Sequence, residues 1–503
     1  MPLRNICITY AVLQLFSVVT FFSFYGNREN YYHISSQIRG NSPDEAFKWL
    51  KREDGLQNQK FRDPLAKLCL HDDLRDQMCP ILFMGNNDIA NGIDRKHTNL
   101  SYQCRISELI KDCSKLIRAH EYHAKPVSQA ERDFPLAFAI KMHRDPEQAE
   151  QLLRAIYRPH NVYCIYVDGK SSTIIHDIMR KIARCFSNIF VIEERLKVIY
   201  GSYAHMQSDL QCMRVLMKSG QKWKYYINLT GQEFPLKTNL EIVEILKSMN
   251  GANDIESYTI PIFLKWRHEK HFYTSSINIV ETSDKKQPFR FNMEISKGSA
   301  YGAYSRKFVD FILTDGFANE FINWLNDTYS PEESVWATLN TLPWAPGGYE
   351  YEIRHRYGNF LSRATIWEDD KSRCHGLYVR GVCTFGIGDL PWLINRPNLF
   401  ANKFNVHMDR VVMDCLEDLN RNRTNNPDIY SLNWFYYRNL PHAKLYAERD
   451  VSKYYSDKNM MLLKEEWMKK QTRGDGTKSS RRSKSDDRFS LPGSSMNMYT
   501  VRA

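Results

Sequence analysis

The strongest constraint on the fold is a regular alternation of strand-like and helix-like segments between residues 134 and 230. Apolar runs such as FPLAFAIKMH and NVYCIYVDGK are separated by amphipathic runs such as PEQAEQLLRAIY. This alternation predicts an α/β fold with a doubly wound, mostly parallel sheet. The predicted strands cover residues 134–143, 161–170, 188–193 and 225–229, and the predicted helices cover residues 146–157, 173–186 and 204–220.

Three polar side chains follow predicted strands. His143 and Asp168 follow the first two, and Glu233 follows the last one, where the sequence WKYYINLTGQEFPLKTN breaks at a Thr-Gly pair. Ligands of open α/β sheets bind at the carboxyl ends of the strands, so we expect a nucleotide ligand near these residues. The alternative for the stretch at residues 223–239 is a core strand with a polar turn.

The phosphate-binding motifs of other α/β nucleotide enzymes are missing. No GxGxxG follows the first strand and no GxxxxGK[ST] occurs, which argues against dinucleotide enzymes and P-loop NTPases. Asp168 in YVDGK has no second carboxylate to complete an Asp-x-Asp metal motif, and the acidic run at residues 368–370 reads as a solvated loop. A bound diphosphate would then be neutralised by basic side chains, and no metal is expected.

A membrane anchor is predicted at residues 6–25, which are uncharged and about long enough to cross a bilayer. No small-x-small cleavage site is evident, which favours an uncleaved anchor over a signal peptide. Residues 1–5 would form a cytoplasmic tail, residues 26–65 a stem, and residues 66–440 the lumenal domain.

Ten of the 11 cysteines lie outside the anchor, and none forms the close CxxC pair of a zinc site. An anchored chain with scattered cysteines is typical of a disulfide-bonded protein of the secretory pathway. Sequons at Asn99, Asn326 and Asn422 agree with a lumenal body, whereas a fourth at Asn228 lies inside a predicted strand and is not expected to be used. The ten cysteines are Cys69, Cys79, Cys104, Cys113, Cys164, Cys185, Cys212, Cys374, Cys383 and Cys415.

The formal net charge of +11 does not indicate a nucleic-acid-binding protein, because the excess is not gathered in one folded stripe. Much of it lies in the run KKQTRGDGTKSSRRSKSDDR near the carboxyl end. We therefore expect residues 441–503 to form a basic, largely disordered tail.

Six segments in one order resemble the core 2 and I-branching β-1,6-N-acetylglucosaminyltransferases (glycosyltransferase family 14), which include peptide xylosyltransferase relatives. They are LLRAIYRPHNVYCIYVD, WKYYINLTGQEFPLKTNLEIV, KGSAY, DTYSPEESVWAT, VCTFGIGDLPWL and LFANKF. The resemblance runs from about residue 113 to 415. It implies a GT-A-type fold with a nucleotide-sugar half at about 134–255 and an acceptor-side lobe at about 256–440. It also implies a single-pass type II Golgi membrane enzyme that inverts a UDP-sugar without metal or other cofactor.

The resemblance also implies roles for seven residues. Glu333 in SPEESVW matches the catalytic base, while Arg380 and Lys403 match the pair that binds the diphosphate. Such a division suits an inverting transfer, which needs a base for the acceptor hydroxyl and a stabiliser for the departing UDP. The other matches are His143 and Asp168 on the nucleotide side, and Glu256 and Arg267 as acceptor contacts.

The resemblance further implies four disulfides, with an extra pair between Cys79 and Cys104. One departure from the family pattern is that Ala364 and Ile366 stand where core 2 enzymes carry aromatic residues against the acceptor sugar. This departure leaves the acceptor, and with it the donor sugar, open. The four implied disulfides are Cys113–Cys185, Cys164–Cys212, Cys374–Cys383 and Cys69–Cys415.

The pattern around Glu333 has a purely structural interpretation. Ser330, Pro331 and Glu333 fit a capping box, with serine at the N-cap, proline at N1 and glutamate at N3. Glu332 is a local competitor for the role of the base, because it precedes Glu333 and faces about 100° away on a helix.

The expected reaction is β-1,6 transfer of a sugar, with N-acetylglucosamine as first choice, to a Gal/GalNAc-containing O-glycan on a glycoprotein. The alternatives are transfer of another UDP-hexose, peptide O-xylosyl transfer, and a lumenal carbohydrate-binding protein without turnover. Expected partners are the UDP-sugar, the O-glycan acceptor and the membrane, but not nucleic acid; a homodimer is left open.

Overall fold

The computed structural model describes residues 101–122, 128–350, 352–354, 358–369, 374–429, 432–448 and 457–472, with short pieces between residues 65 and 93. The predicted anchor, the predicted stem up to residue 64, the Asn99 sequon and residues 473–503 lie outside these residues. Within the described part, no helix is both long and apolar enough to cross a membrane. The predicted anchor thus stays a prediction.

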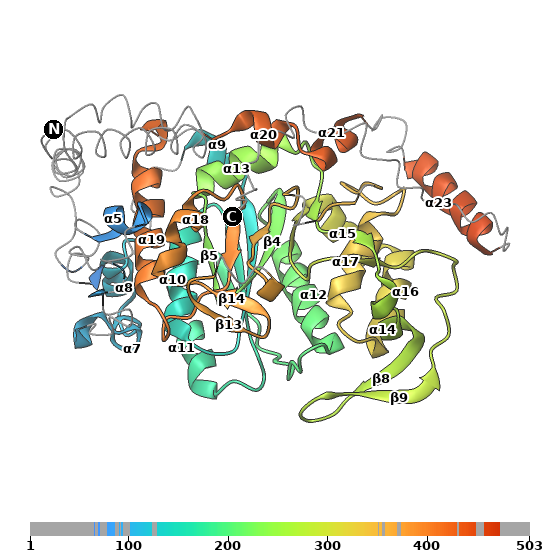
Figure 1. The fold of residues 1–503 in the computed structure, drawn as a ribbon, viewed down its shortest axis with the longest axis horizontal. Coiled ribbons are helices and arrows are strands. Elements are labelled where there is room, and N and C mark those ends of the chain that lie inside the picture. Colours follow the sequence, from blue (N-terminus) through green and yellow to red (C-terminus); the bar gives the residue numbers. More distant parts are fainter. Residues whose placement is uncertain are drawn as a thin grey trace, which may run out of the picture.

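A six-stranded sheet forms the centre of the fold, in the order β3-β2-β1-β4-β11-β6 (Figure 1). The first four strands run parallel, whereas β11 is antiparallel to both of its neighbours. This confirms the predicted α/β fold with a mostly parallel sheet. The strands are β1 (Leu136–Met142), β2 (Val162–Val167), β3 (Ile189–Val191), β4 (Tyr225–Thr230), β6 (Asp254–Ile255) and β11 (Gly302–Ser305).

Helices cover both faces of this sheet, and its strands are therefore buried on both sides. Phe138 and Ile140 of β1 contribute to one hydrophobic core, and Ala137 and Ala139 contribute to the other. The first core includes α10 (Pro146–Ile156), α11 (Thr173–Ala183) and α13 (Asn239–Ser248). The second includes α12 (Tyr203–Lys218), α15 (Arg306–Thr314), α16 (Gly316–Trp324) and α17 (Glu332–Asn340), on the other side of the sheet in Figure 1.

The residues after 256 build on the same sheet. β11 comes from this part of the chain and pairs with β4 and β6. A long hairpin of β8 (Lys270–Thr274) and β9 (Ile279–Lys285) projects from the body (Figure 1). The two expected halves are therefore joined through one sheet.

Three small β-structures complete the fold. One is a three-stranded sheet in the order β12-β15-β5, and another is the hairpin of β13 and β14. The third joins β7 to β10. Their strands are β5 (Glu233–Pro235), β7 (Tyr258–Thr259), β10 (Ser296–Lys297), β12 (Arg363–Ala364), β13 (Leu377–Val379), β14 (Val382–Thr384) and β15 (Phe400–Asn402). The remaining helices used below are α5 (Cys79–Phe83), α14 (Trp266–Glu269) and α19 (Val411–Asn425).

The predicted tail at residues 441–503 is partly wrong. Its described residues form α21 (Pro441–Glu448) and α23 (Asp457–Thr472), the latter at one end of the molecule (Figure 1). Trp467 of α23 lies edge-on against Phe317 and Trp344, with ring centroids 5.6 and 5.2 Å apart. Partial burial of this tryptophan against the second core explains why the segment is helical rather than solvated.

Five disulfides join the ten cysteines. Three implied pairs are confirmed, namely Cys113–Cys185, Cys164–Cys212 and Cys374–Cys383. The other two are wrong, because the structure pairs Cys69 with Cys104 and Cys79 with Cys415. The reason is packing: Cys79 on α5 and Cys415 on α19 belong to one hydrophobic core, while Cys69 and Cys104 belong to another.

The described sequons differ in accessibility. Asn326 is exposed and Asn422 is half-buried within α19. Asn228 is fully buried and its amide donates a hydrogen bond to the Ala300 carbonyl at 2.9 Å. This burial agrees with the expectation that Asn228 is not glycosylated.

Candidate active site

The turn before α17 does not form the predicted capping box. Ser330 has a φ of +50°, and its amide donates to the Gly201 carbonyl at 2.7 Å. The helix begins at Glu332, Pro331 takes the N-cap position, and no side chain caps the helix. The left-handed backbone of Ser330 is the physical reason, because an N-cap serine normally has extended geometry. The carboxylate of Glu333 is therefore not used as a cap.

The Glu333 side chain instead meets two cations at a surface open to solvent. Its Oε2 accepts a hydrogen bond from Arg267 Nη1 at 2.5 Å and lies 3.3 Å from Lys297 Nζ. The side chain of Glu333 is 30% exposed. Arg267 comes from α14 and Lys297 from β10, so three separate elements converge on this carboxylate.

Glu332 lies in a different environment from its neighbour. It is 6% exposed, and its Oε1 lies 3.3 Å from Nδ1 of His205 on α12. Burial pushes the pKa of Glu332 upward, but the ion pair with His205 offsets this and leaves the pKa below its usual value. Glu332 thus holds α17 to α12, while Glu333 faces the solvent side.

The predicted acceptor residues both lie around Glu333. Arg267 contacts its carboxylate directly, as described above. Glu256 is buried, and its backbone carbonyl lies so close to Gly298 that a Cβ on that glycine would sit 1.8 Å from the oxygen. The amide of Gly298 in turn donates to the Glu333 carbonyl at 2.8 Å. The structure therefore brings Glu256, Arg267 and Glu333 together.

Tyr200 is an exposed residue near both Glu333 and Arg380. Partial burial of its phenol and the nearby charge of Glu333 raise the pKa of Tyr200. The Arg380 guanidinium lies 5.6 Å from the centre of the Tyr200 ring. His143 and Asp168 come directly after β1 and β2, but Tyr200 lies well beyond the end of β3 at Val191, so its position after a strand does not single it out in the sequence.

Arg380 and Lys403 are held side by side. Arg380 and Gly381 form the two-residue turn of the β13–β14 hairpin, with φ values of +55° and +74°. This left-handed backbone costs energy for an arginine, and residues held in this way often have a functional role. Lys403 Nζ donates to the carbonyl of Val379, the residue before Arg380, at 2.6 Å.

Arg380 and Lys403 have no carboxylate partner among the residues that the structure describes. Burial lowers the pKa of the Lys403 ammonium, and the positive charges of Arg380 and Arg144 lower it further. Two neighbouring positive charges favour the binding of an anion. Arg380 and Lys403 therefore form a candidate site for a diphosphate.

Asp168 and His143 lie at the carboxyl ends of β2 and β1, as predicted. Asp168 Oδ1 accepts hydrogen bonds from the amides of Lys170 at 2.8 Å and Val198 at 3.2 Å. Burial and the charge of Arg144 lower the pKa of the His143 imidazole, while the charge of Asp168 opposes this. Because β1 and β2 are paired with Met142 against Val167, the two residues that follow lie at neighbouring strand ends.

Glu233 is not at the ligand site, so this prediction is wrong. Its side chain is fully buried, and Oε2 lies 2.7 Å from Nε of Arg363. Asn402 and Thr230 donate hydrogen bonds to Oε1 at 3.0 and 3.3 Å. Pairing of β5 with β15 turns this carboxylate into the interior, where it stabilises the small sheet.

Two further predictions concern the acceptor side and metal binding. Ala364 and Ile366 are 3% and 1% exposed and pack in a hydrophobic core, so they do not form a surface for the acceptor. Within the described residues, the only cluster with the spacing of metal ligands is Cys374, Cys383 and Asp389. Its two cysteines form a disulfide, which leaves no thiolate for a metal.

Comparisons with known proteins identify related sequences. Residues 136–394 match the family model described as Core-2/I-Branching enzyme. A "Beta-1,3-galactosyl-O-glycosyl-glycoprotein beta-1,6-N-acetylglucosaminyltransferase 3" from Ovis aries is 34% identical over 385 residues, covering 73% of this chain and 87% of that protein. An "N-acetyllactosaminide beta-1,6-N-acetylglucosaminyl-transferase" from Homo sapiens is 39% identical over 318 residues, covering 62% of this chain and 78% of that protein.

Proposed function

The chain belongs to the core-2/I-branching enzyme family and is a glycosyltransferase, and from this premise we propose that it transfers N-acetylglucosamine from UDP-N-acetylglucosamine in β-1,6 linkage. The proposed acceptor is a galactose- or N-acetylgalactosamine-containing O-glycan. The names of the related proteins support the transferred sugar and the linkage. The observation that carries the proposal is the partly exposed carboxylate of Glu333, held by Arg267 and Lys297, in a structure that also holds Lys403 against the turn of Arg380.

In the proposed mechanism, Glu333 accepts the proton of the acceptor's 6-hydroxyl group. The oxygen attacks the anomeric carbon of the donor sugar from the face opposite UDP. The new carbon–oxygen bond forms as the bond to the UDP oxygen breaks, and the electron pair leaves with the diphosphate. The anomeric configuration is inverted in this single displacement.

Arg267 and Lys297 are assigned to orienting the base. Their side chains hold the carboxylate in place through the two ion pairs described above. Because Glu333 is partly open to solvent, an acceptor hydroxyl can replace one of these contacts. Arg267 and Glu256 then bind the acceptor sugar, as the family resemblance implies.

Arg380 and Lys403 are assigned to the departing UDP. Two fixed cations stabilise the negative charge that develops on the diphosphate, which is the role a divalent metal plays in other enzymes. His143 and Asp168, at the ends of β1 and β2, would bind the nucleotide side of the donor. We therefore propose that the transfer is independent of metal.

We also propose that the catalytic domain faces the Golgi lumen on a type II anchor at residues 6–25. Five disulfides support an oxidising compartment, because such bonds rarely persist in the cytosol. Protease protection of the chain in sealed microsomes tests this topology. Digestion of the domain from outside the vesicles would contradict it.

The enzymatic proposal is tested with the detergent-solubilised full chain. UDP-N-acetylglucosamine, UDP-galactose, UDP-glucose and UDP-xylose are each offered with a Galβ1,3GalNAc acceptor, an N-acetyllactosamine acceptor and a serine-containing peptide. We expect transfer of N-acetylglucosamine to a sugar 6-hydroxyl group, with a β-anomeric proton coupling in the NMR spectrum of the product. Xylosylation of the peptide, another hexose in the product, or no turnover with any pair would contradict the proposal.

A further inference from the structure

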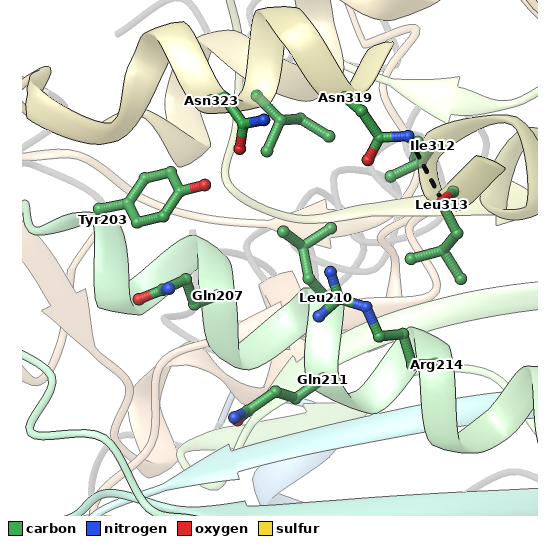
Figure 2. A pocket seen from close by; sticks show the side chains of 10 residues that line it. Tyr203, Gln207, Leu210, Gln211, Arg214, Ile312, Leu313, Asn319 and Asn323 are labelled. Carbon is green, nitrogen blue, oxygen red and sulfur yellow. Dashed lines mark hydrogen bonds between the residues drawn. The ribbon is translucent and has the colours of Figure 1, made fainter. Parts of the chain in front are cut away.

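A cavity lies outside the candidate active site, between α12 and the α15–α16 pair (Figure 2). Its volume is about 250 Å³, and none of its lining residues belongs to the cluster around Glu333, Arg380 and Lys403. Figure 2 shows the side chain of Tyr203 reaching into this space from α12 and that of Asn323 entering it from α16. The lining residues are Tyr203, Gln207, Leu210, Gln211, Arg214, Ile312, Leu313, Asn319, Ile322 and Asn323.

The cavity is lined by groups that form hydrogen bonds but have few partners within the protein. Within the described part of the chain, the side chains of Gln207, Arg214 and Asn323 make no hydrogen bond. Oε1 of Gln211 is shielded from solvent and also has no partner. A buried acceptor of this kind is uncommon in folded proteins and often indicates that a ligand or water completes the site.

The lining also has a definite charge. Arg214 is the single charged side chain around the cavity, and no acidic residue lines it. Leucine and isoleucine side chains of α12, α15 and α16 supply an aliphatic wall. Hydroxyl and amide groups beside an aliphatic wall suit a sugar ring, which presents both hydroxyl groups and C–H faces. The unpaired guanidinium suits a carboxylate, which it can bind through two parallel hydrogen bonds.

The polar residues of α12 are arranged in a row. Tyr203, Gln207, Gln211 and Arg214 are spaced by four, four and three residues, so they share one face of the helix. The row extends over about 16 Å at the usual rise of an α-helix. This length suits an extended ligand rather than a single small molecule.

We propose that this cavity, called the groove below, is a second glycan-binding site, selective for an oligosaccharide that carries one carboxylate-bearing sugar. The inference rests on the proposed function to the extent that glycans are the acceptors of the enzyme. A branch of the acceptor glycoprotein bound at the groove raises the effective concentration of another branch at Glu333. The site therefore lowers the KM for large acidic acceptors and leaves turnover of a disaccharide acceptor unchanged.

The test uses the full chain and two soluble probes, 3′-sialyllactose and lactose, with binding followed by saturation-transfer NMR. We expect sialyllactose to bind at least tenfold more tightly than lactose. Arg214→Ala should weaken sialyllactose binding about tenfold or more, the usual effect of losing a charge-assisted hydrogen bond. The matched control is Lys218→Ala, which removes another exposed cation of α12 outside the cavity and should change nothing.

A second variant keeps the test decisive if Arg214→Ala folds poorly. Gln207→Ala combined with Asn323→Ala removes one amide from each side of the groove and should also weaken sialyllactose binding. In all of these variants the transfer to Galβ1,3GalNAc should equal that of the wild type, so failure of the groove is separable from failure of the proposed function. Equal binding of the two probes, an unaffected Arg214→Ala chain, or preference for an acidic peptide over sialyllactose would overturn the proposal.

Discussion

Two arginine–carboxylate pairs in this molecule have the same chemistry and different surroundings. Glu233 and Arg363 lie 2.7 Å apart with side chains that are 0% and 2% exposed. Glu333 and Arg267 lie 2.5 Å apart with side chains that are 30% and 15% exposed. We call the first pair, which is buried and joins β5 to β12, the closed pair. We call the second pair, which joins α17 to α14, the open pair.

The comparison shows how burial separates a structural charge from a reactive one. In the closed pair, Asn402 and Thr230 donate hydrogen bonds to Oε1 of Glu233, and both charged side chains are buried away from solvent. The open pair contacts solvent, so its carboxylate can exchange a cation for an acceptor hydroxyl. The predictions below test this difference, from the largest effect to the smallest.

The largest expected effect is the loss of the folded protein when the closed pair is broken. Arg363→Leu leaves Glu233 charged and unpaired in the interior, which typically costs about 3–5 kcal/mol of folding free energy. We expect a low yield of folded variant protein and a much lower melting temperature by calorimetry. The matched variant Arg267→Leu in the open pair should lose only about 1 kcal/mol, because solvent can stabilise Glu333. Equal losses in both variants would contradict the distinction.

The next effect concerns the donor. Arg380→Ala and Lys403→Ala each remove a cation that is assigned to the diphosphate, so we expect a higher KM for the UDP-sugar and lower turnover, each by about tenfold. Steady-state kinetics with varied donor measures both. Arg290→Ala, which removes an exposed arginine paired with Glu320 elsewhere, is the control and should behave as wild type. Unchanged donor kinetics in both test variants would remove these residues from the site.

A smaller effect concerns pH and another buried carboxyl group, that of Asp254. Burial raises the pKa of Asp254 to about 6, although Ser362 and the Leu361 amide donate hydrogen bonds to it. A carboxyl group whose pKa is raised in the folded state stabilises the fold fully below its unfolded pKa, and this contribution is lost as pH rises through about 6. Lowering the pH from 7 to 5 should therefore add about 1 kcal/mol through this group.

Urea unfolding at both pH values gives the change in unfolding free energy between pH 7 and pH 5. The difference in this change between the wild type and Asp254→Asn isolates the contribution of Asp254. Two other buried carboxyl groups contribute to the pH dependence with the opposite sign, because their pKa is lowered. Although both are buried, Arg154 lowers the pKa of Glu417 to about 2, and His120 and Arg154 lower the pKa of Glu150 to about 2. Their stabilisation is lost only below about pH 4.5, outside this window. An identical pH dependence in wild type and Asp254→Asn would exclude the effect.

The smallest expected effect is none at all, and it concerns metal. Because Arg380 and Lys403 are assigned to the charge of the leaving group, transfer should persist at its full rate in excess EDTA. The assay is the standard transfer reaction with and without chelator. Abolition by EDTA and recovery with manganese would contradict the assignment.

The sequence predicts the parts of the fold that depend on local patterns. The strands and helices between residues 134 and 230 follow from apolar periodicity, and His143 and Asp168 follow from their places after two of these strands. The closed pair could not be predicted in this way. Glu233 is sealed by Asn402, a residue 169 positions away, so its burial depends on the pairing of distant strands.

The same limit applies to the site around Glu333. Ser330 reads as an N-cap in the sequence, but a hydrogen bond from its amide to the Gly201 carbonyl holds it in a left-handed conformation. Cys79 and Cys104 read as an extra disulfide, but the packing of α5 against α19 gives Cys79 a different partner. In each case a contact between distant segments decides the structure.

The most direct test of the account compares Glu333→Gln with Glu332→Gln, two neighbours on α17 that differ in access to solvent. An amide cannot accept the acceptor's proton, so turnover of Glu333→Gln should fall by roughly 10²–10⁴-fold, the usual contribution of a general base. Its melting temperature and UDP binding should stay near those of the wild type. Glu332→Gln weakens only the buried contact with His205, so its turnover should remain within about tenfold of the wild type. An active Glu333→Gln enzyme beside an inactive, folded Glu332→Gln enzyme would contradict the assignment of Glu333 as the base.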